Sequence, residues 1–383
     1  MNIAGKFIGE DHPVFIIAEI GQNHQGCLRI AKEMILKAKQ LGVDCVKFQK
    51  SDLQSKFTKK ALEKPYVGPN SWGATYGEHK SHLEFTIDDY KVLQNFCTEI
   101  DILFTASAMD PVSLQQLVDL RVPFIKIGSG DADNIPLLRQ AALVDIPLVV
   151  STGMQSWTQV QHIHQIIGHK PSALLHCVSA YPTASEDACL GLITLYNQHF
   201  PELIVGYSGH ELGLQITVAS VLLGARIIER HFTLDKTWKG TDHKASLDTN
   251  ELARLTKYIR TVENIGRAES NHKIHEILQQ VLNEEDYNRE ELHAALKPVT
   301  VNDRKLMPSE LPCHSKLGKS LVFSNDVEPE HVLRSSDIAV KVSEPQGLQP
   351  AKFDKIVGRK VTRRFRKDDP IMEHELASGT SKN

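Results

Sequence analysis

Long apolar runs are missing from this sequence, and so is any excess of positive charge. No stretch approaches the ~18 consecutive apolar residues of a membrane-spanning helix, and the first residues, MNIAGKFIGEDHP, contain no apolar leader. The 44 Lys and Arg residues are balanced by 47 Asp and Glu residues, giving a formal charge of -3. This balance argues against a nucleic-acid-binding protein. We expect a soluble cytoplasmic protein that binds small molecules and neither nucleic acid nor membrane.

Paired cysteines are also missing. The six cysteines have no CxxC spacing, and several lie in apolar runs, where a free thiol behaves as a small hydrophobic side chain. They are Cys27, Cys45, Cys97, Cys177, Cys189 and Cys313. This pattern is typical of a reducing compartment and predicts no disulfide framework.

A GxGxxG motif is absent from the start of the first expected helix, which disfavours the alternative of an open, doubly wound sheet. Instead, short β-branched runs alternate eight times with segments that have helical spacing of apolar residues. The expected strands are 14–21, 45–49, 102–107, 124–130, 147–153, 173–181, 203–209 and 226–234. Parallel strands need helical crossovers, and eight of them close on a filled interior. The sequence therefore predicts an α/β fold, a (β/α)8 TIM barrel over residues 1–268.

The rest of the chain does not continue this alternation. Residues 269–313 are polar, acidic and weakly helical, and we interpret them as a linker. Residues 314–375 contain short strand-like pieces broken by Pro, Gly and Asp, which predicts a small β-rich domain. Residues 376–383 are expected to be a flexible end. Within the barrel, the connection over 51–87 is long enough to be a lid or a surface excursion.

Polar residues follow the apolar runs at the expected carboxyl ends of the strands, where barrel enzymes carry their chemistry. His210 and His231 end the last two strands, which are neighbours in a barrel, so both rings could hold one divalent metal ion. Two nitrogen ligands leave open positions and suit a catalytic Mn²⁺ or Mg²⁺. The alternative is a pair of histidines satisfied by backbone hydrogen bonds.

Charged residues interrupt other strands. Lys47 and Lys126 lie in apolar runs and predict an anionic substrate, or pair with an acid such as Glu19 or Asp131. Hydroxyls and glycines in their neighbourhood suit a phosphate or carboxylate. Acids that face such a cationic pocket can orient hydroxyls or move protons. Asp242, on a loop, is also a candidate for an ordinary salt-bridge partner.

Taken together, the motifs resemble one enzyme family. These are FIIAEIGQNHQG, VKFQ, FTAS, KIGSGD, STGM, SAYPT, GYSGHE, ERHFTLD and KGTDHKASL, in this order along the chain. The chain is similar to the sialic acid synthases, and its tail resembles their antifreeze-like domain (SAF, β-clip). The stretches SWGATYGEHKSHLEF and LDKTWKGTDH look like those of animal members.

The resemblance implies a reaction and a set of site residues. The family condenses phosphoenolpyruvate with an N-acylmannosamine, and animal members use N-acetylmannosamine 6-phosphate to make N-acetylneuraminate 9-phosphate. By this likeness His210 and His231 hold the metal, and Glu19, Asp131, Asp242 and Tyr181 serve the chemistry. The predicted substrate-binding residues are Lys47, Gln49, Thr105, Lys126, Ser129, Ser179 and Ser208. The resemblance also implies a homodimer in which each tail covers the partner's barrel.

Two features depart from the family pattern. Asp131 stands where bacterial members usually carry Glu, which shortens the reach of that carboxylate. Lys341 stands near the position of a bacterial tail arginine, with no arginine beside it. Candidates for the sugar phosphate are Lys80, Arg230, Lys239 and Lys244. Mannose 6-phosphate is a second candidate substrate of such a synthase. Other hypotheses are a different phosphoenolpyruvate- or aldol-type barrel enzyme and a non-catalytic glycan- or ice-binding protein.

Overall fold

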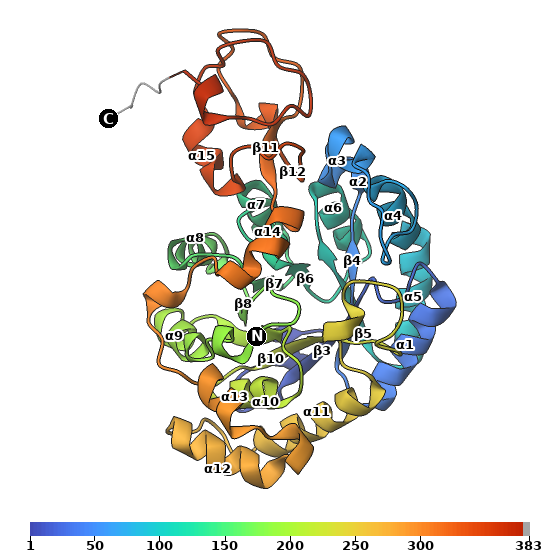
Figure 1. The fold of residues 1–383 in the computed structure, drawn as a ribbon, viewed down its shortest axis with the longest axis vertical. Coiled ribbons are helices and arrows are strands. Elements are labelled where there is room, and N and C mark those ends of the chain that lie inside the picture. The colour runs from blue at the N-terminus through green and yellow to red at the C-terminus, as the bar shows by residue number, and fades with distance from the viewer. Residues whose placement is uncertain (378–383) are drawn as a thin grey trace.

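The computed structural model describes residues 1–377 and contains the predicted barrel (Figure 1). Eight parallel strands close in the order β10-β3-β4-β5-β6-β7-β8-β9. They are β3 (Phe15–Gly21), β4 (Cys45–Lys50), β5 (Leu103–Ala108), β6 (Ile125–Ile127), β7 (Leu148–Ser151), β8 (Ser172–Cys177), β9 (Ile204–Gly209) and β10 (Ile227–His231). The prediction of a (β/α)8 fold is confirmed, and most strands are shorter than the apolar runs that mark them.

Helices surround the strands, as crossover connections require. They are α1 (Leu28–Gln40), α5 (Ile87–Glu99), α6 (Pro111–Asp119), α7 (Ile135–Leu143), α8 (Trp157–Ile167), α9 (Gly191–His199), α10 (Gln215–Leu222) and α11 (Thr249–Val262). Their start positions follow from local chemistry. Thr86, Asp110, Ser156 and Asp248 each accept a hydrogen bond from a backbone N–H of the helix that they precede.

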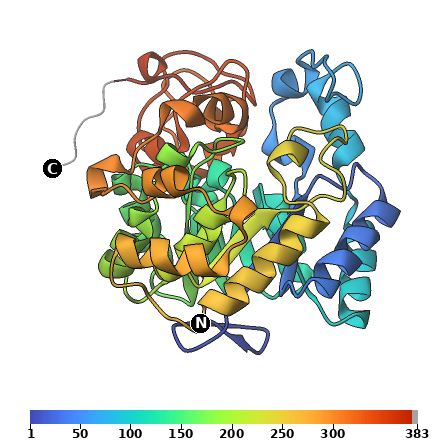
Figure 2. The same cartoon turned by 60° about the horizontal axis from the view of Figure 1, so that its bottom comes forward.

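A hairpin covers the amino end of the barrel. Strands β1 (Asn2–Ile3) and β2 (Lys6–Phe7) pair in antiparallel fashion, and Ile3 and Ile8 are buried in one cluster with Phe15 and Phe124. Figure 2 shows this hairpin at the bottom of the molecule, and the segments that border the other end of the barrel at the top. Only the carboxyl end is therefore available for a site.

The long connection 51–87 folds into three short helices at that carboxyl end: α2 (Leu53–Lys56), α3 (Lys59–Glu63) and α4 (Tyr76–Leu83). Phe57, Ala61 and Tyr76 form a small core of their own. Lys50 and Glu84 tie its two ends together through a 2.5 Å ion pair. We call residues 51–87 the lid segment, because part of it borders the main cavity.

The expected linker, 269–313, carries helices that pack on the barrel. Ile274 and Leu278 of α12 (Asn271–Val281) and Leu292 of α13 (Arg289–Ala295) belong to the main hydrophobic core. The polar sequence of this segment hides these few apolar positions. A third helix, α14 (Leu311–Leu317), lies beside the carboxyl end of the barrel (Figure 1).

The tail has its own hydrophobic core, which includes Leu321, Phe323, Phe353 and Phe365. Its regular strands are β11 (Ser320–Phe323) and β12 (Ile338–Lys341), which pair in antiparallel fashion, and isolated bridges such as Val361 with Leu376 join the rest. A short helix, α15 (Phe353–Ile356), completes it. Of the expected flexible end, 376–383, residues 378–383 lie outside the described residues.

In this single chain the tail lies against its own barrel. The backbones of Lys56 and Thr58 exchange hydrogen bonds with Val342, and Arg139 of α7 forms a two-pronged ion pair with Asp354, with both distances 2.7 Å. These contacts join the tail to the lid segment and to α7.

A search of residues 1–377 finds no helix that is both long and apolar enough to cross a membrane.

Candidate active site

A cavity of about 970 Å³ opens at the carboxyl end of the barrel. It is lined by strand ends, by the lid segment, by the loop between β10 and α11, and by α14. The predicted site residues on its wall are Glu19, Lys47, Gln49, Lys126, Ser129, Asp131, Ser179, Tyr181, Ser208, His210, His231 and Asp242. The sequence prediction that these residues converge is therefore supported by the geometry.

Thr105 is the exception among the predicted substrate-binding residues. It is completely buried, and its hydroxyl donates to the carbonyl of Phe124 at 2.7 Å. The next residue on the same face of β5, Ser107, lines the cavity instead and accepts a hydrogen bond from Lys47 at 3.1 Å. Thr105 lies one layer deeper in the barrel, where its side chain serves the strand pairing.

Two buried lysines and two buried carboxylates form what we call the floor of the cavity: Glu19, Lys47, Lys126 and Glu229. Lys47 forms an ion pair with Glu19 and lies 3.6 Å from Glu229. Lys126 lies 3.8 Å from Glu229 and donates to the hydroxyl of Ser151 at 2.7 Å. Ser208 donates to Glu229 at 3.2 Å. Lys47 pairs with Glu19, one of the two acids predicted as partners, whereas Lys126 lies near Glu229, which was not named as one. Both lysines also line the cavity, and binding of an anionic substrate stays a prediction.

The floor charges tune one another's pKa values. Burial by itself favours the neutral amine of Lys47, but Glu19 and Glu229 raise its pKa above the usual value. Burial lowers the pKa of Lys126, against the attraction of Glu229. Burial also opposes ionisation of Glu229, yet Lys126 and Lys47 lower its pKa. The positive and negative groups of the floor therefore compensate one another. Glu229 was not among the predicted site residues.

The amide of Gln49 donates to Glu19 Oε1 at 3.0 Å and holds that carboxylate in place. Oε2 of Glu19 contacts the amine of Lys47, whereas Oε2 of Glu229 is buried without a hydrogen-bond partner. Buried carboxylate oxygens normally have partners, so Oε2 of Glu229 is an acceptor available to a ligand or water.

Gly153 lets two hydroxyls approach each other on the opposite wall. A Cβ on Gly153 would come within 2.2 Å of Ser179 Oγ and 2.6 Å of Ser129 Oγ. The N–H of Gly153 donates to Ser129 Oγ at 3.0 Å. The position requires glycine, because the backbone passes directly between the two serines.

Glu310 fixes the same wall from outside the barrel. This buried carboxylate accepts hydrogen bonds from the backbone N–H groups of Met154 at 2.7 Å and Ser179 at 2.8 Å. The residue lies in the segment that sequence reasoning interpreted as a linker, and no local signal marked it.

His210 and His231 lie close together, with ring centroids 5.6 Å apart. Nδ1 of His210 is 2.8 Å from the carbonyl oxygen of Val178, to which it donates, so Nε2 keeps its lone pair. Burial lowers the pKa of His231 to about 4, and its Nδ1 is buried without a hydrogen-bond partner. Tyr181 stacks on His210 at 4.0 Å between centroids. Burial lowers the pKa of His210, but Cys177 and the carbonyl of Val178 raise it above its ordinary value. The two imidazoles face one region of the cavity.

These two histidines suit a divalent cation with open positions. Residues 1–377 contain no cluster of three or more His, Cys, Asp or Glu side chains arranged to hold a metal. Asp242 is near enough to His231 to be the main charge that favours its protonated form, after the opposing effect of burial. A cation bound here would take further ligands from water or substrate, the pattern of a catalytic site.

Asp131 lines the cavity from η1 (Ser129–Asp131) with its carboxylate already engaged. It forms a buried ion pair with Lys319 and accepts a hydrogen bond from Asn134 at 3.0 Å. Lys319 also donates to the carbonyl of Met109 at 2.5 Å. Lys341, the other tail lysine, does not line this cavity and pairs with Asp368 at 2.9 Å.

Three further lysines stand at the mouth of the cavity: Lys80, Lys239 and Lys316, which we call the rim. Counting floor, rim and the remaining wall, nine lysines and four carboxylates line the cavity. Lysines therefore outnumber carboxylates on the wall, although Lys236 is paired with Glu251 and the pKa of Lys56 is lowered by burial to about 7, so the cavity favours anions.

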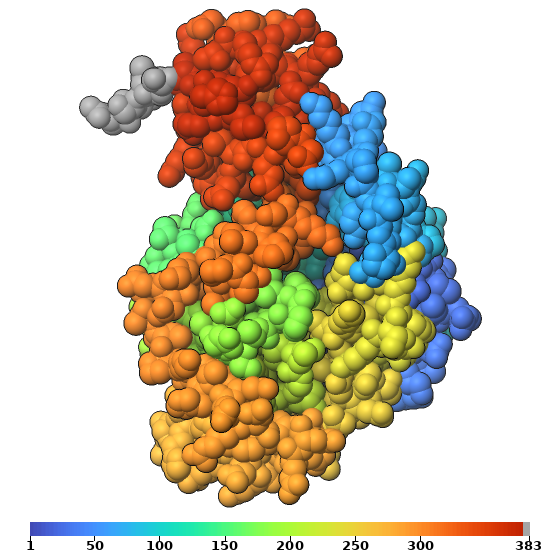
Figure 3. Space-filling view, viewed as in Figure 1, coloured from blue at the N-terminus to red at the C-terminus, as the bar shows by residue number. Residues whose placement is uncertain are grey.

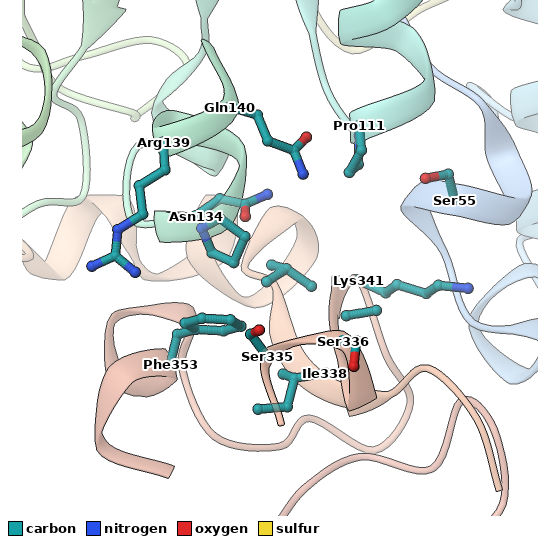
Figure 4. Close-up of a pocket in the computed structure, with 13 residues that line it drawn as sticks. Ser55, Pro111, Asn134, Arg139, Gln140, Ser335, Ser336, Ile338, Lys341 and Phe353 are labelled. Carbon is teal, nitrogen blue, oxygen red and sulfur yellow. The ribbon is translucent and has the colours of Figure 1, made fainter. Parts of the chain in front are cut away.

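A second groove, of about 530 Å³, lies between the tail and α7 (Figure 4). Its two cationic residues are already satisfied, because Arg139 pairs with Asp354 and Lys341 donates to the carbonyl of Gln54 at 2.8 Å. In Figure 4 the amine of Lys341 points toward the segment that carries Ser55. The chemistry therefore belongs to the first cavity.

Comparisons with known proteins agree with this geometry. Residues 34–270 match the NeuB family, and residues 318–377 match the SAF domain.

The chain is 48% identical to an N-acetylneuraminate-9-phosphate synthase of Drosophila melanogaster, covering 98% of each chain. It is 46% identical to the Homo sapiens protein of the same name, covering 96% of this chain and 94% of that one. The crystal structure of the Bacillus subtilis spore coat polysaccharide biosynthesis protein SpsE superposes with a TM-score of 0.74 at 26% identity, covering 99% of each chain. The barrel with its anion-binding cavity, followed by an SAF domain, thus belongs to the NeuB family.

Proposed function

We propose that this chain condenses phosphoenolpyruvate with N-acetylmannosamine 6-phosphate, with uptake of one water, to give N-acetylneuraminate 9-phosphate and inorganic phosphate. The observation that carries the proposal is near full-length identity of 48% to a synthase of that name. The charge of the cavity fits both substrates. Phosphoenolpyruvate carries about three negative charges and a sugar phosphate about two, and lysines outnumber carboxylates on the wall.

The floor suits phosphoenolpyruvate. Lys47 and Lys126 offer ammonium donors to its carboxylate and phosphate, and the hydroxyls of Ser129, Ser179 and Ser208 lie on the same wall. Glu19 and Glu229 keep the amine of Lys47 charged before the substrate arrives, and Glu229 offsets part of the cost of burying the charge of Lys126. Preorganised charge of this kind stabilises a transition state without the cost of reorganisation.

The histidine side of the cavity suits the open-chain sugar. A new carbon–carbon bond forms between the methylene carbon of phosphoenolpyruvate and the aldehyde carbon, and the aldehyde oxygen takes up a proton. Water then adds to the former enol carbon, and the bond from that carbon to the phosphate oxygen breaks. Glu19, Gln49 and Asp242 are placed to orient sugar hydroxyls and this water, and Tyr181 shields His210 from solvent.

His210 and His231 would hold a divalent ion such as Mn²⁺ or Mg²⁺, since both rings line the cavity and the bond from Nδ1 of His210 to the carbonyl of Val178 leaves its Nε2 for a ligand. When bound there, the ion supplies Lewis acidity toward the aldehyde oxygen. Asp131 stays paired with Lys319, so it positions that wall and leaves the histidine side to Asp242.

The function is tested by release of inorganic phosphate from phosphoenolpyruvate in the presence of Mn²⁺ and N-acetylmannosamine 6-phosphate. Mass spectrometry should identify the nine-carbon phosphorylated product. Parallel reactions with mannose 6-phosphate and with unphosphorylated N-acetylmannosamine rank the aldehydes. Release only with an unrelated aldehyde would assign a different phosphoenolpyruvate-using reaction, and folded protein that releases none would contradict the proposal.

The metal site is tested by binding as well as by activity. Mn²⁺ titration followed by electron paramagnetic resonance should show one tight site, lost in His210→Ala and His231→Ala. Phosphate release should fall by roughly 10²-fold or more in both variants. His272→Ala, on the exposed face of α12, is the matched control. Equal Mn²⁺ binding in all four proteins would remove the two histidines from the metal site.

Two further features of the proposal concern the assembly and its location. The contacts between tail and barrel in this chain are the kind that two copies can exchange, and we infer a homodimer in which each tail covers the partner's barrel. Light scattering measures the mass of that assembly. All six cysteines are free, which supports a cytoplasmic location.

A further inference from the structure

The rim of the cavity holds more cationic groups than phosphoenolpyruvate can use. Lys80 comes from α4 of the lid segment, Lys239 from the loop between β10 and α11, and Lys316 from α14. These segments are far apart in the sequence. In Figure 3 the lid segment in light blue, the loop in yellow and α14 in orange surround one hollow on the visible face.

The rim lysines lack the carboxylate partners that the floor lysines have. Across residues 1–377, no Asp or Glu oxygen lies within ion-pair distance of Lys80, Lys239 or Lys316. The groups in contact with Lys80 and Lys239 are neutral. Lys80 donates to Gln22 Oε1 at 2.8 Å and lies 5.6 Å from the ring centroid of Tyr76. Lys239 lies 4.7 Å from the ring centroid of Trp72. Asp242 and Glu84 act on Lys80 from beyond ion-pair distance. Three ammonium groups around one cavity mouth without a paired carboxylate form an incomplete anion site.

His79 shows that the three charges act on one place. Burial lowers its pKa to about 4, and the next causes are the charges of Lys80 and Lys316, with Lys239 adding to them. The same repulsion acts between the lysines. Burial and then the charge of Lys316 lower the pKa of Lys80 to about 8. A bound dianion would relieve this repulsion.

Asp242 connects the rim to the histidine pair. Burial opposes its ionisation, but His231, Lys316 and Lys80 all favour its charged form, so its carboxylate lies within electrostatic reach of both groups. An open-chain aldose phosphate carries its aldehyde at one end and its phosphate at the other. Its hydroxyls, between those ends, would then lie beside Asp242.

We propose that Lys80 and Lys316, with Lys239 beside them, bind the phosphate group of a phosphorylated open-chain aldose whose aldehyde lies at His210 and His231. This inference rests on the proposed function, and it assigns the group that selects a phosphorylated sugar over its unphosphorylated form. The phosphate completes a rim that comes from three separate segments, so its binding draws the lid segment and α14 together over the cavity.

The other sequence candidates are less suitable. Arg230 is fully buried, donates to Glu211 Oε1 at 2.9 Å and does not line the cavity. Lys244 lines the cavity but is not among the charges that lower the pKa of His79.

The experiment compares Lys80→Gln, Lys316→Gln and Lys239→Gln in steady-state assays with phosphorylated and unphosphorylated N-acetylmannosamine. Lys80→Gln and Lys316→Gln should each raise KM for the 6-phosphate by roughly 10- to 100-fold. Lys239→Gln, at the outer side, should raise it by about 3- to 10-fold. KM for phosphoenolpyruvate and KM for the unphosphorylated sugar should change less than about twofold. Lys80→Arg keeps the charge and should recover most of the affinity.

Lys60→Gln is the matched control, because Lys60 is an exposed lysine of α3 in the same lid segment. The inference is overturned if the rim variants raise KM equally for both sugars, or if they raise KM for phosphoenolpyruvate instead. Either result leaves the proposed function intact.

A binding measurement separates this inference from the proposed function. Titration calorimetry with N-acetylmannosamine 6-phosphate, without phosphoenolpyruvate, needs no turnover. Native protein should bind the 6-phosphate at least tenfold more tightly than the unphosphorylated sugar, and Lys80→Gln should abolish that difference. Equal affinity of native protein for both sugars overturns the rim assignment, whereas tight 6-phosphate binding without phosphate release overturns the reaction alone.

Discussion

At the floor of the cavity each lysine lies within ion-pair distance of a buried carboxylate, whereas the three rim lysines have no carboxylate at that distance among residues 1–377. The floor is embedded in barrel strands and is compensated before any ligand arrives. The rim comes from segments outside the strands, and its charges repel one another. The difference indicates two kinds of anion site in one cavity: a rigid, prepaired one, and one that a ligand must complete.

The largest expected loss of stability and activity follows from removing a lysine of the floor. Lys47→Met removes the amine between Glu19 and Glu229 and leaves two buried carboxylates without their shared partner. We expect a loss of about 3–5 kcal/mol in the free energy of unfolding and a fall in phosphate release of about 10²- to 10³-fold. Urea denaturation and the phosphate assay measure the two effects.

The double variant Lys47→Met, Glu19→Gln sharpens this prediction. It should regain part of the lost stability, because one unpaired charge is removed, while phosphate release stays low. Lys60→Met is the control for a lysine at an exposed position. If Lys47→Met unfolds at the same urea concentration as the native chain, the floor is not a prepaired network.

A smaller change in the free energy of unfolding, a gain instead of a loss, is expected when the buried Lys56 is replaced. Its amine contacts Ser51 and Met109, and burial, with repulsion by Lys80 and Lys319, lowers its pKa to about 7. The unfolded chain keeps this proton up to a pH of about 10.5, so the folded state is penalised most below pH 7. Lys56→Met should therefore stabilise the protein, by roughly 1–3 kcal/mol at pH 6.

The pH dependence of that gain gives the check. Between pH 7 and 10.5 the native chain releases the Lys56 proton in the folded state only, so its stability rises relative to the variant. Urea denaturation at pH 6 and pH 9 should show a larger advantage of Lys56→Met at pH 6. An advantage that is equal at both pH values would mean that Lys56 is not a strained buried amine.

The smallest effect is expected outside the cavity. Lys64 and Glu344 form a 2.5 Å ion pair between the lid segment and the tail, with both side chains about half exposed. Exposed pairs contribute roughly 0–1 kcal/mol. Lys64→Ala should shift the thermal midpoint by no more than a few degrees, with unchanged kinetics. A loss as large as that of Lys47→Met would show that burial does not separate the two classes of ion pair.

Much of the fold follows from local pattern. Eight alternating runs predict eight strands, and strand ends with polar residues predict the cavity wall. The depth of each inward-facing residue in the barrel is harder to predict from the sequence, because residues two apart on a strand share a face. Thr105 and Ser107 both point inward from β5, yet only Ser107 reaches the cavity. Depth along the barrel decides between them, and sequence spacing does not contain it.

Contacts between residues far apart in the sequence could not be predicted either. Glu310 binds the backbone of Ser179 across 131 positions, and Lys319 reaches Asp131 across 188. Each residue lies in a polar stretch, where a single acid or lysine is ordinarily a solvated side chain. The lysines and histidines of the cavity wall could be predicted from the sequence, because they interrupt or end apolar strands. The groups that approach from outside the barrel could not.

The segment 298–319 has a further consequence for how such chains can be divided. The match to the NeuB family ends at residue 270. The backbone carbonyl of Arg304 nevertheless accepts a hydrogen bond from the N–H of Trp157 at 2.8 Å, and the carboxylate of Glu310 binds the loops after β7 and β8. The stretch of sequence that this active site needs is therefore longer than the barrel. A recombination event that joins this barrel to a foreign tail preserves the site only if the crossover point falls after Lys319.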